Sequence, residues 1–579
     1  MNLALDPRSQ TVHGELEDGM NISATILAWG RTSPSRVAID DGAGVRTYAS
    51  LAASVEAWAG RFQAKGLGAG DVVLVFLPQA AETVAIYFGL MRCGAIPSFM
   101  PLPSPKQDPD YYWTSHQQLL EVIRPAALVT EAAHRPAIRA AGFDSRIDLI
   151  LAPDDAWPET TVETAFPDTS ADDLALLQHS SGTTSLKKGV MLSHKVISRQ
   201  VDAYRRALDA SVEDVVVSWL PMYHDMGLIA CTVLPLMLGQ KLVLLDPFQW
   251  VGDPRSLLRA IDRHRGTLVW LPNFAFELLA KVVRYEPGGL DLSSVRAFID
   301  CSEPCKPASF DRFVAHFAAA GVHHGQLQVC YAMAETVFAV TQTRPGARVT
   351  RLRVDADRLA ADRMVVPPRD NTTAVELLSA GQPVEGMELR VVDSVGRSLA
   401  EGQVGEIELV SEFLFDGYFN RPEITAERLR DGRYRSNDLG FVRDGELYVL
   451  GRVDDLIIVH GRNYFAHEVE AIANRVPGLK AGRNVAVGVF NEMLGTQDIV
   501  LIAEVAGGVA AAEAVALKRA VKHQIQERMA LDLREVKLVD ADWLVKTTSG
   551  KISRDLNLEK YMKGQAAGQR RPGGGADVG

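Results

Sequence analysis

Residues Gln178–His194 read QHSSGTTSLKKGVMLSH and are the most informative stretch of the 579-residue chain. The apolar run LALLQ leads into this stretch and GVML leads out of it, so the pattern predicts a loop between two strands. Small residues let backbone N–H groups approach a phosphate, while hydroxyls add donors and lysines add positive charge. The same composition also fits a flexible polar hairpin loop. It does not fit a Walker A loop, because the G-x-x-x-x-G-K-[ST] spacing is missing.

The segments around this loop alternate between strand and helix patterns up to about residue 345. A helical pattern begins at Thr47 and ends at Gly66, and the strand DVVLVFLP and the helix ETVAIYFGLMRCG follow it. This alternation predicts βα units that build a mostly parallel sheet covered by helices. From Leu377 onward, GEIELV and GELYVLGR alternate apolar and polar residues, which indicates half-buried antiparallel strands.

A second domain is predicted to begin near Gly451, with the strands LIIVH, NVAVGVF and DIVLIAEV. Two amphipathic helices belong to it, with apolar faces on Phe465, Val469, Ile472 and Val476 and on Leu517, Val521 and Ile525. We therefore expect domains over residues 20–450 and 451–563, after a loose lead-in. Residues 564–579 are predicted to be a disordered tail, because GQAAGQRRPGGGADVG offers little apolar surface to bury.

Composition and charge narrow the class of protein. The net charge is −11, from 61 basic and 72 acidic residues, which disfavours a nucleic-acid or anionic-membrane partner. The longest apolar stretch, Leu228–Leu238, falls short of the roughly 20 residues that a membrane-spanning helix needs. The five cysteines include no CxxC pair, which argues against a disulfide framework or a common zinc site. We expect a soluble, cytoplasmic protein without a secretory signal.

Two further motifs place polar side chains among apolar neighbours. Trp219–Gly227, WLPMYHDMG, sets His224 and Asp225 beside aromatic and sulfur side chains, either as a catalytic pair or as a structural one. Tyr331–Val337, YAMAETV, contains the carboxylate of Glu335. A buried carboxylate is costly unless it is paired or holds a cation, so Glu335 is either a metal ligand or a neutralised core residue.

Three motifs follow in the second half of the chain. SNDLG at Ser436–Gly440 and GRVDD at Gly451–Asp455 contain acidic residues that could equally serve as turn or cap residues. KTTSGKISR at Lys546–Arg554 places Lys551 on a glycine-containing loop, where a solvated surface lysine is the ordinary alternative.

Taken in order, these motifs resemble those of the adenylate-forming ligase superfamily, over roughly residues 25–560. The resemblance implies an α/β protein with the adenylate-forming enzyme fold. A large N-terminal domain with mostly parallel sheets plus a distorted β-barrel would bind ATP and the acid. A small α+β C-terminal lid domain would contribute one lysine and rotate between two half-reactions.

Within this superfamily the chain most resembles the fatty acyl-AMP ligases. GRNYFAHEVE at Gly461–Glu470 is similar to their GRNHYPxDIE pattern, and LPNFAFELLA at Leu271–Ala280 to their PNFAF segment. The latter is mostly apolar, which suits an alkyl or aryl acid. Residues 343–376 resemble an insertion that is held to impede the lid rotation needed for free coenzyme A. The alternative is an idle surface loop.

The resemblance also assigns roles to individual residues. By this resemblance, the β- and γ-phosphates of the nucleotide would be bound by Ser180, Ser181, Gly182, Thr183, Thr184 and Lys188. Adenine would lie between Tyr331 and the backbone of Cys301, Ser302, Glu303 and Pro304. Glu335 would hold Mg²⁺ and Thr336 would touch the α-phosphate. The adenine segment departs from the common pattern, because Cys301-Ser302 stands where Gly-Ala is frequent.

Further roles concern the ribose, the acid and the lid. Asp438 would accept hydrogen bonds from both ribose hydroxyls, with Arg452 nearby. His224 would sit beside the acyl carboxylate, and Lys551 would bridge that carboxylate and the nucleotide. Asp454 resembles the hinge of the lid.

The resemblance therefore implies an ATP- and Mg²⁺-dependent ligase that converts a fatty acid to acyl-AMP with release of pyrophosphate. The acyl group would then pass to the phosphopantetheine thiol of an acyl carrier protein. An acyl-CoA ligase that uses free coenzyme A is the alternative. A non-catalytic adenylate-binding regulator is a third reading, which the presence of Lys551 and Glu335 disfavours.

Overall fold

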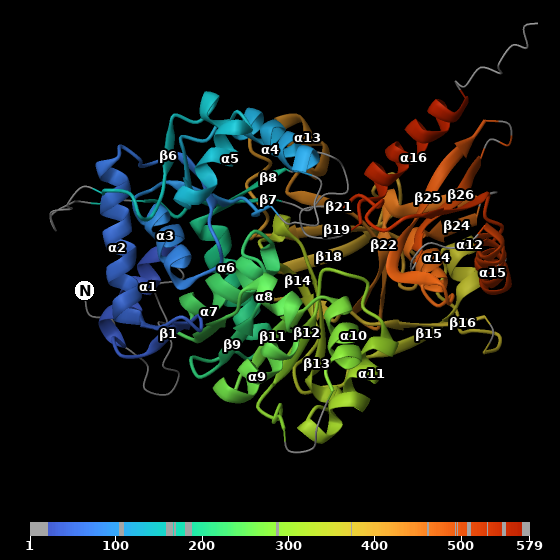
Figure 1. The fold of residues 1–579 in the computed structure, drawn as a ribbon. Helices are drawn as coiled ribbons and strands as arrows, with labels where there is room; N and C mark the ends of the chain where they lie inside the picture. Colours follow the sequence, from blue (N-terminus) through green and yellow to red (C-terminus); the bar gives the residue numbers. More distant parts are fainter. Residues whose placement is uncertain are drawn as a thin grey trace, which may run out of the picture.

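The fold is seen in a computed structural model of the chain (Figure 1). It describes residues 21–103, 109–157, 166, 169–179, 188–284, 289–371, 373–459, 462–492, 494, 496–505, 511–529, 531–546 and 552–569. No helix in these ranges combines the length and the apolar character that a membrane crossing requires.

The largest sheet has nine strands. In spatial order they are β17 (Gln382–Pro383), β14 (Ala339–Gln342), β13 (Leu327–Ala332), β12 (Ala297–Asp300), β11 (Leu268–Leu271), β9 (Val215–Ser218), β10 (Lys241–Leu244), β1 (Val37–Asp40) and β2 (Val45–Thr47). The strands from β13 to β1 pair in parallel, and the pairs at both edges are antiparallel. The mostly parallel sheet predicted from the alternating pattern is confirmed.

A smaller sheet carries the first βα units. Its four parallel strands are β4 (Ile96–Phe99), β3 (Val72–Phe76), β5 (Ala127–Thr130) and β6 (Leu149–Leu151). The predicted strand DVVLVFLP is β3, and the helical patterns around it are α2 (Tyr48–Ala64) and α3 (Ala81–Arg92). Thr47 caps α2, because its side chain accepts a hydrogen bond from Ser50 N.

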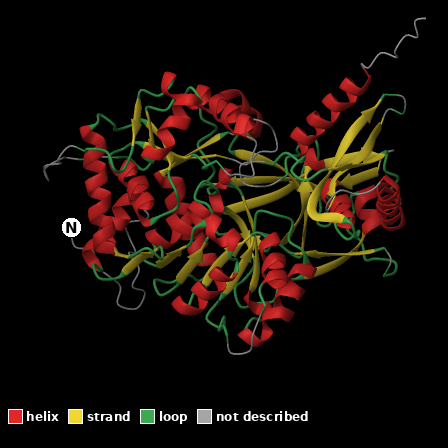
Figure 2. Ribbon diagram, in the orientation of Figure 1, coloured by secondary structure: helices red, strands yellow, loops and turns green. Residues whose placement is uncertain are grey.

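Helices surround the strands of both sheets (Figure 2). The remaining helices of this part are α1 (Ile22–Thr32), α4 (Pro109–Ile123), α5 (Arg135–Ala140), α6 (His194–Ala207), α7 (Leu234–Met237), α8 (Pro247–Gly252), α9 (Arg255–His264), α10 (Asn273–Val282) and α11 (Pro307–Phe317). A π-helix, Met226–Val233, directly follows the His224–Asp225 pair. Most buried apolar side chains of these elements form one large core.

Antiparallel strands follow, as the period-two pattern predicts. One sheet contains β18 (Met387–Val392), β19 (Gly405–Ser411), β20 (Leu429–Arg430), β21 (Arg433–Arg443) and β22 (Glu446–Arg452), with α13 (Pro422–Arg428) beside it. The hairpin of β7 (Leu174–His179) and β8 (Gly189–Ser193) joins this region through a bridge between Val190 and Tyr418. Residues 343–376 form β15 (Arg351–Asp355), α12 (Ala356–Asp362) and the start of β16 (Ala374–Leu378).

The C-terminal part has its own apolar clusters. Its elements are β23 (Leu456–Val459), β24 (Arg462–Phe465), α14 (Ala466–Ala473), β25 (Leu479–Asn491), β26 (Thr496–Val505), α15 (Ala511–Met529), β27 (Glu535–Val539) and α16 (Arg554–Gln569). Val469, Val521 and Ile525 are buried together, as their spacing predicts.

Two details of this part differ from the prediction. Phe465 does not share the face of Val469, because it stands at the N-cap of α14 and packs against Leu439, Phe441 and Tyr448 of the antiparallel sheet. α16 continues to Gln569, beyond the predicted start of a tail at residue 564. Glutamine and alanine extend a helix readily, although they add little buried apolar surface.

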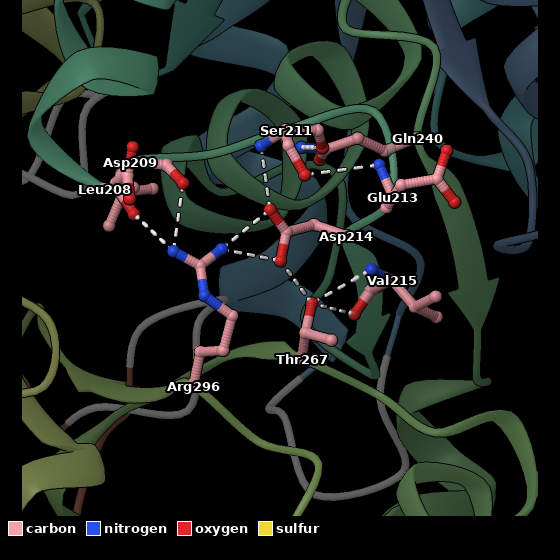
Figure 3. Close-up of polar contacts among 9 residues, drawn as sticks. All are labelled: Leu208, Asp209, Ser211, Glu213, Asp214, Val215, Gln240, Thr267 and Arg296. Carbon is pink, nitrogen blue, oxygen red and sulfur yellow. Dashed lines mark hydrogen bonds and ion pairs between the residues drawn. The ribbon is translucent and has the colours of Figure 1, made fainter.

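A buried polar network ties together the amino ends of β9, β11 and β12 (Figure 3). Arg296 Nη1 donates to both carboxylate oxygens of Asp214, at 2.7 and 2.8 Å, and Arg296 Nη2 donates to the carbonyls of Leu208 and Asp209. Thr267 Oγ1 donates to Asp214 Oδ1 at 2.7 Å. Asp214 is 3% exposed and Arg296 35% exposed, so the pair is shielded mainly on the carboxylate side.

Replacing Asp214 by alanine is expected to destabilise the fold by about 3 kcal/mol, because the guanidinium of Arg296 then loses its partner in a half-buried position. The midpoint of urea unfolding, followed by tryptophan fluorescence, measures this loss. Asp291→Ala removes the partner of Arg265 in a pair that is more than half exposed, and should lower the urea midpoint much less, because exposed ion pairs contribute little to stability. Equal losses for the two variants would contradict the structural role given to Asp214.

Candidate active site

The predicted phosphate loop connects two strands, as its flanking runs indicate. β7 and β8 pair antiparallel, and His179 faces Gly189 at the end of the hairpin. Ser180, Ser181, Gly182, Thr183 and Thr184 lie outside the described residues, so their assigned contacts stay predictions. Lys188 is described, and its Nζ lies 5.0 Å from the centre of the Tyr418 ring. Burial lowers the pKa of Lys188, and the nearby carboxylate of Glu335 partly opposes that shift.

Glu335 lies on a short turn of 3₁₀ helix, Ala334–Thr336, just after β13. It is 9% exposed, and Tyr418 Oη donates a hydrogen bond to its Oε1 at 2.7 Å. The chain around Tyr418 is itself fixed, because Met191 N donates to Gly417 O and Phe415 N donates to the backbone carbonyl of Glu335. The hairpin, the Glu335 turn and the Tyr418 segment therefore meet at one place.

The residues present fit a magnesium ion that a nucleotide brings with it. Among the described residues, no group of three or more His, Cys, Asp or Glu side chains is arranged to hold a metal. Mg²⁺ does not need such a cage, since it is commonly held by one or two carboxylates together with phosphate oxygens. Glu335, hydrogen-bonded through one oxygen and close to Lys188, supplies such a carboxylate.

Thr336 is fully buried, and its hydroxyl is close to two main-chain carbonyls. Oγ1 lies 3.1 Å from Met333 O and 2.9 Å from Phe338 O. Val337 follows with a positive φ of 65° and a ψ of −53°, which a β-branched residue rarely adopts. In this structure Thr336 therefore shapes the tight turn that presents Glu335. Its contact with an α-phosphate stays a prediction.

The predicted adenine and ribose ligands contact each other. Tyr331 Oη donates to Asp438 Oδ2 at 2.6 Å, and Arg452 Nε lies 3.5 Å from Asp438 Oδ1. Asp438 and Arg452 face each other across the β21–β22 pair, so the register of the sheet holds them together. Burial raises the pKa of Asp438 to about 6, although Arg452 and the Tyr331 hydroxyl both lower it. Ribose hydroxyls would replace Tyr331 as donors to this carboxylate.

ATP binding is expected to weaken as the pH falls through about 6, because protonation removes acceptor capacity from Asp438. Tyr331→Phe removes a donor that favours the ionised form, so the pKa of Asp438 rises and the midpoint moves to higher pH. The pH dependence of the KM for ATP measures this shift. Tyr561→Phe loses a tyrosine–carboxylate bond of equal length, 2.6 Å, elsewhere and should keep the wild-type midpoint. An unshifted midpoint in Tyr331→Phe would contradict the assignment.

The predicted hinge residue is tied to the neighbour of the ribose ligand. Asn437 Nδ2 donates to Asp454 Oδ2 at 2.5 Å. Asn437 has a left-handed backbone, at φ 64°, a conformation that asparagine tolerates better than most residues. Its backbone N–H donates to Glu406 Oε1 at 3.1 Å, which fixes it to β19. The hinge segment thus contacts the antiparallel sheet beside Asp438.

Lys551 lies outside the described residues, but the stem of its loop is described. Lys546 and Ile552 form an antiparallel bridge, and Ser553 N donates to Val545 O at 3.0 Å. Arg554, three positions after the lysine, pairs with Asp455 at 2.5 Å and with Glu470 at 2.8 Å. Asp455 adjoins the predicted hinge, so the loop stem is anchored beside the segment that carries Arg452 towards Asp438.

His224 and the adenine segment lie at the carboxyl ends of β9 and β12. His224 Nδ1 is 2.5 Å from Asp225 Oδ1, so the two side chains form a pair. Ser302 Oγ is 3.9 Å from Met226 Sδ, which brings the adenine segment against the turn that holds His224. The side chain of Glu303 accepts a hydrogen bond from Phe274 N at 3.0 Å.

Several residues of this site were not singled out in the sequence. Tyr418 holds Glu335, Asn437 holds Asp454, and Arg554 and Asp455 anchor the loop of Lys551. Asn437 lies beside Asp438 in SNDLG, and Asp455 lies beside Asp454 in GRVDD, so these two motifs already pointed to their neighbourhood. Tyr418 carried no comparable signal, because its role depends on a contact 83 positions away in the chain.

Comparisons with known proteins agree with this geometry. The AMP-binding enzyme family matches residues 27–419. A long-chain-fatty-acid–AMP ligase of Mycobacterium marinum, FadD26, is 30% identical over 85% of this chain and 87% of its own. JamA of Moorena producens, a medium-chain-fatty-acid–[acyl-carrier-protein] ligase, is 28% identical over 86% of this chain and 87% of its own.

Solved structures give the same result. A structure from a study of fatty acyl-adenylate ligases of E. coli and L. pneumophila covers 94% of this chain and 98% of its own, at 27% identity and a TM-score of 0.85. The predicted fold and the predicted resemblance are confirmed. The chain belongs to the AMP-binding enzyme family, and its relatives there include fatty-acid–AMP ligases.

Proposed function

We propose that the protein activates a fatty acid with ATP, releases pyrophosphate and passes the acyl group from acyl-AMP to the phosphopantetheine thiol of a carrier protein. The observation that carries this proposal is the convergence of Lys188, Glu335, Asp438 and Arg452. These residues come from separate elements. Tyr418 contacts two of them, since its hydroxyl donates to Glu335 and its ring centre lies 5.0 Å from Lys188 Nζ. Arg452 Nε lies 3.5 Å from Asp438 Oδ1. The family resemblance assigns Lys188 to the outer phosphates, Glu335 to Mg²⁺, and Asp438 with Arg452 to the ribose of one nucleotide.

The arrangement suggests how the first step proceeds. Asp438 and Tyr331 would hold the nucleoside, while Lys188 and the loop before it would hold the outer phosphates. Mg²⁺ would be held by Glu335 and would neutralise charge on the departing pyrophosphate. The fatty carboxylate, placed beside His224, attacks the α-phosphorus, forming one P–O bond as the bond to pyrophosphate breaks. Placement and electrostatic stabilisation are the protein's main contributions to such a reaction.

In the second step, the carrier thiol attacks the acyl carbonyl of the mixed anhydride. A C–S bond forms, the C–O bond to AMP breaks, and the thiol proton is released to solvent. The relation to JamA, which is named for an acyl-carrier-protein partner, supports this choice of acceptor. A cytoplasmic location is part of the same proposal.

The contacts of residues 343–376 also support a carrier protein over free coenzyme A. Asn463 Nδ2 of β24 donates to Ala360 O of α12 at 3.0 Å. Phe465 and Leu456 share an apolar cluster with side chains of the insertion and of β16, namely Leu352, Leu359, Val365 and Leu377. α12 lies beside β24 in Figure 1. We propose a domain boundary near Gly451, across which these contacts resist rotation of the C-terminal domain.

Purified enzyme with ATP and a fatty acid is expected to form thioester on a phosphopantetheinylated carrier protein at least ten-fold faster than on free coenzyme A. Comparing the two acceptors at equal thiol concentration, with preformed acyl-AMP, isolates the second step. Asn463→Ala breaks a contact with residues 343–376. This variant should therefore show a smaller ratio between the rate with the carrier protein and the rate with coenzyme A. Equal rates with coenzyme A and with several carrier proteins would favour an acyl-CoA ligase.

A further inference from the structure

The adenine segment and the start of α10 leave the central sheet side by side. Leu271 and Asp300, the last residues of β11 and β12, are register partners, and Cys301 N donates to Leu271 O at 3.1 Å. α10 begins directly afterwards, and its N-cap residue, Pro272, offers no side-chain acceptor. The first N–H groups of a helix have no partner within the helix, so α10 needs an acceptor from elsewhere.

Glu303 supplies that acceptor from the adenine segment. Its Oε2 lies 3.0 Å from Phe274 N, in the first turn of α10. A carboxylate is favoured there, because the amino end of a helix carries partial positive charge. A second, buried link joins the same two segments, since Asn273 Nδ2 donates to Asp300 Oδ2 at 2.6 Å.

The two links enclose a strained residue. Ser302 has a left-handed backbone, at φ 71°, which is sparsely populated by residues other than glycine. Such a conformation persists where the surroundings fix it, and it is frequent at functional sites. The links at Asp300 and Glu303 lie on either side of Ser302 and hold the bend of the adenine segment.

Phe274 extends this connection towards the predicted acid site. Phe274 is 46% exposed, and its ring centre lies 6.3 Å from the ring centres of both Trp219 and Trp250. These two tryptophans stack on each other at 3.6 Å. Trp219 begins the segment that carries His224. Contacts therefore run from the adenine segment through Glu303 and Phe274 to the aromatic residues near His224.

We propose that Glu303 is a positioning residue that couples the nucleotide site to the fatty-acid site, so that ATP and the acid bind cooperatively. This inference rests on the proposed function and on the roles that the family resemblance gives to the adenine segment and to residues 271–280. A ligand that shifts either segment also shifts the other through these links, so the binding free energies of the two ligands are coupled. Such coupling is reciprocal, and factors between 5 and 150 are typical.

Titration calorimetry tests the coupling with full-length protein and α,β-methylene-ATP, whose methylene bridge prevents transfer of AMP to the acid. The acid is the saturated fatty acid of eight to eighteen carbons that gives the fastest pyrophosphate exchange. We expect the acid to tighten nucleotide binding by at least ten-fold in the wild type and by less than three-fold in Glu303→Ala. Glu303→Gln keeps an acceptor oxygen and should retain at least five-fold coupling.

Thr47→Ala is the matched control, because it removes the cap of α2, far along the chain, and should keep the wild-type coupling. Wild-type coupling in Glu303→Ala, or absent coupling in the wild type, would overturn the inference. If Glu303→Ala does not fold, the Glu303→Gln variant tests the inference instead. Coupling below three-fold in Glu303→Gln would contradict a link that depends on this hydrogen bond. Failure of the wild type to form acyl-AMP with any fatty acid would instead overturn the proposed function.

Discussion

Replacing Lys551 by alanine is expected to lower the rate of acyl-AMP formation by about 10²–10³-fold, the loss typical when one preorganised charge is removed from a transition state. The proposed role of Lys551 is to neutralise charge between the fatty carboxylate and the α-phosphate. The stem of its loop is anchored by Arg554 to Asp455, beside the segment that carries Arg452 to Asp438. Pyrophosphate release, measured with saturating ATP and acid, gives the rate.

Two comparisons separate this role from a general loss of structure. Lys563→Ala removes another lysine of the C-terminal part, which pairs with Glu559 on α16, and should change the rate less than two-fold. Transfer from chemically prepared acyl-AMP should also survive in Lys551→Ala, because the first step is bypassed. Pyrophosphate release at the wild-type rate in Lys551→Ala would remove the residue from the mechanism.

Glu335→Gln is expected to lower kcat/KM for ATP by about 10²-fold and to raise the Mg²⁺ concentration needed for half-maximal activity. Glutamine keeps the shape and can still accept the hydrogen bond from Tyr418, so the main change is the loss of a negative charge. Mg²⁺ prefers charged oxygen ligands, and the amide is a weaker one. A magnesium titration of acyl-AMP formation at fixed ATP measures the effect.

The matched control is Glu408→Gln, which also neutralises a buried carboxylate but one that pairs with Arg390 on the antiparallel sheet. It should reduce stability and leave the magnesium requirement unchanged. Tyr418→Phe should lower kcat/KM for ATP by about ten-fold, because it removes one hydrogen bond to Glu335 and keeps the negative charge of Glu335. An unchanged magnesium requirement in Glu335→Gln would contradict the role of Glu335 as a metal ligand.

Local patterns predicted those parts of the molecule that depend on neighbours in sequence. The apolar runs on either side of the phosphate loop became β7 and β8, and DVVLVFLP became β3. The periodic faces at Val469 and at Val521 and Ile525 became a shared core. In each case burial of one face is determined by spacing, which can be read directly from the residues.

Contacts between distant segments could not be predicted in this way. The spacing of Phe465 fits the face of α14, yet its side chain packs in another cluster because it precedes the helix. Tyr418 meets Glu335 because the segment after β19 returns to the turn that follows β13. Glu303 meets Phe274 because the parallel strands β11 and β12 end side by side. The ligand roles came from the order of motifs, whereas the residues that hold those ligands in place required the structure.

The proposed first reaction is tested most directly by ATP–pyrophosphate exchange across carboxylic acids from acetate to long-chain and aryl acids. The account predicts exchange that depends on Mg²⁺ and on one chain-length class of fatty acid, well above the rate without acid. Exchange at the acid-free background with every acid, by protein that still binds ATP, would contradict it.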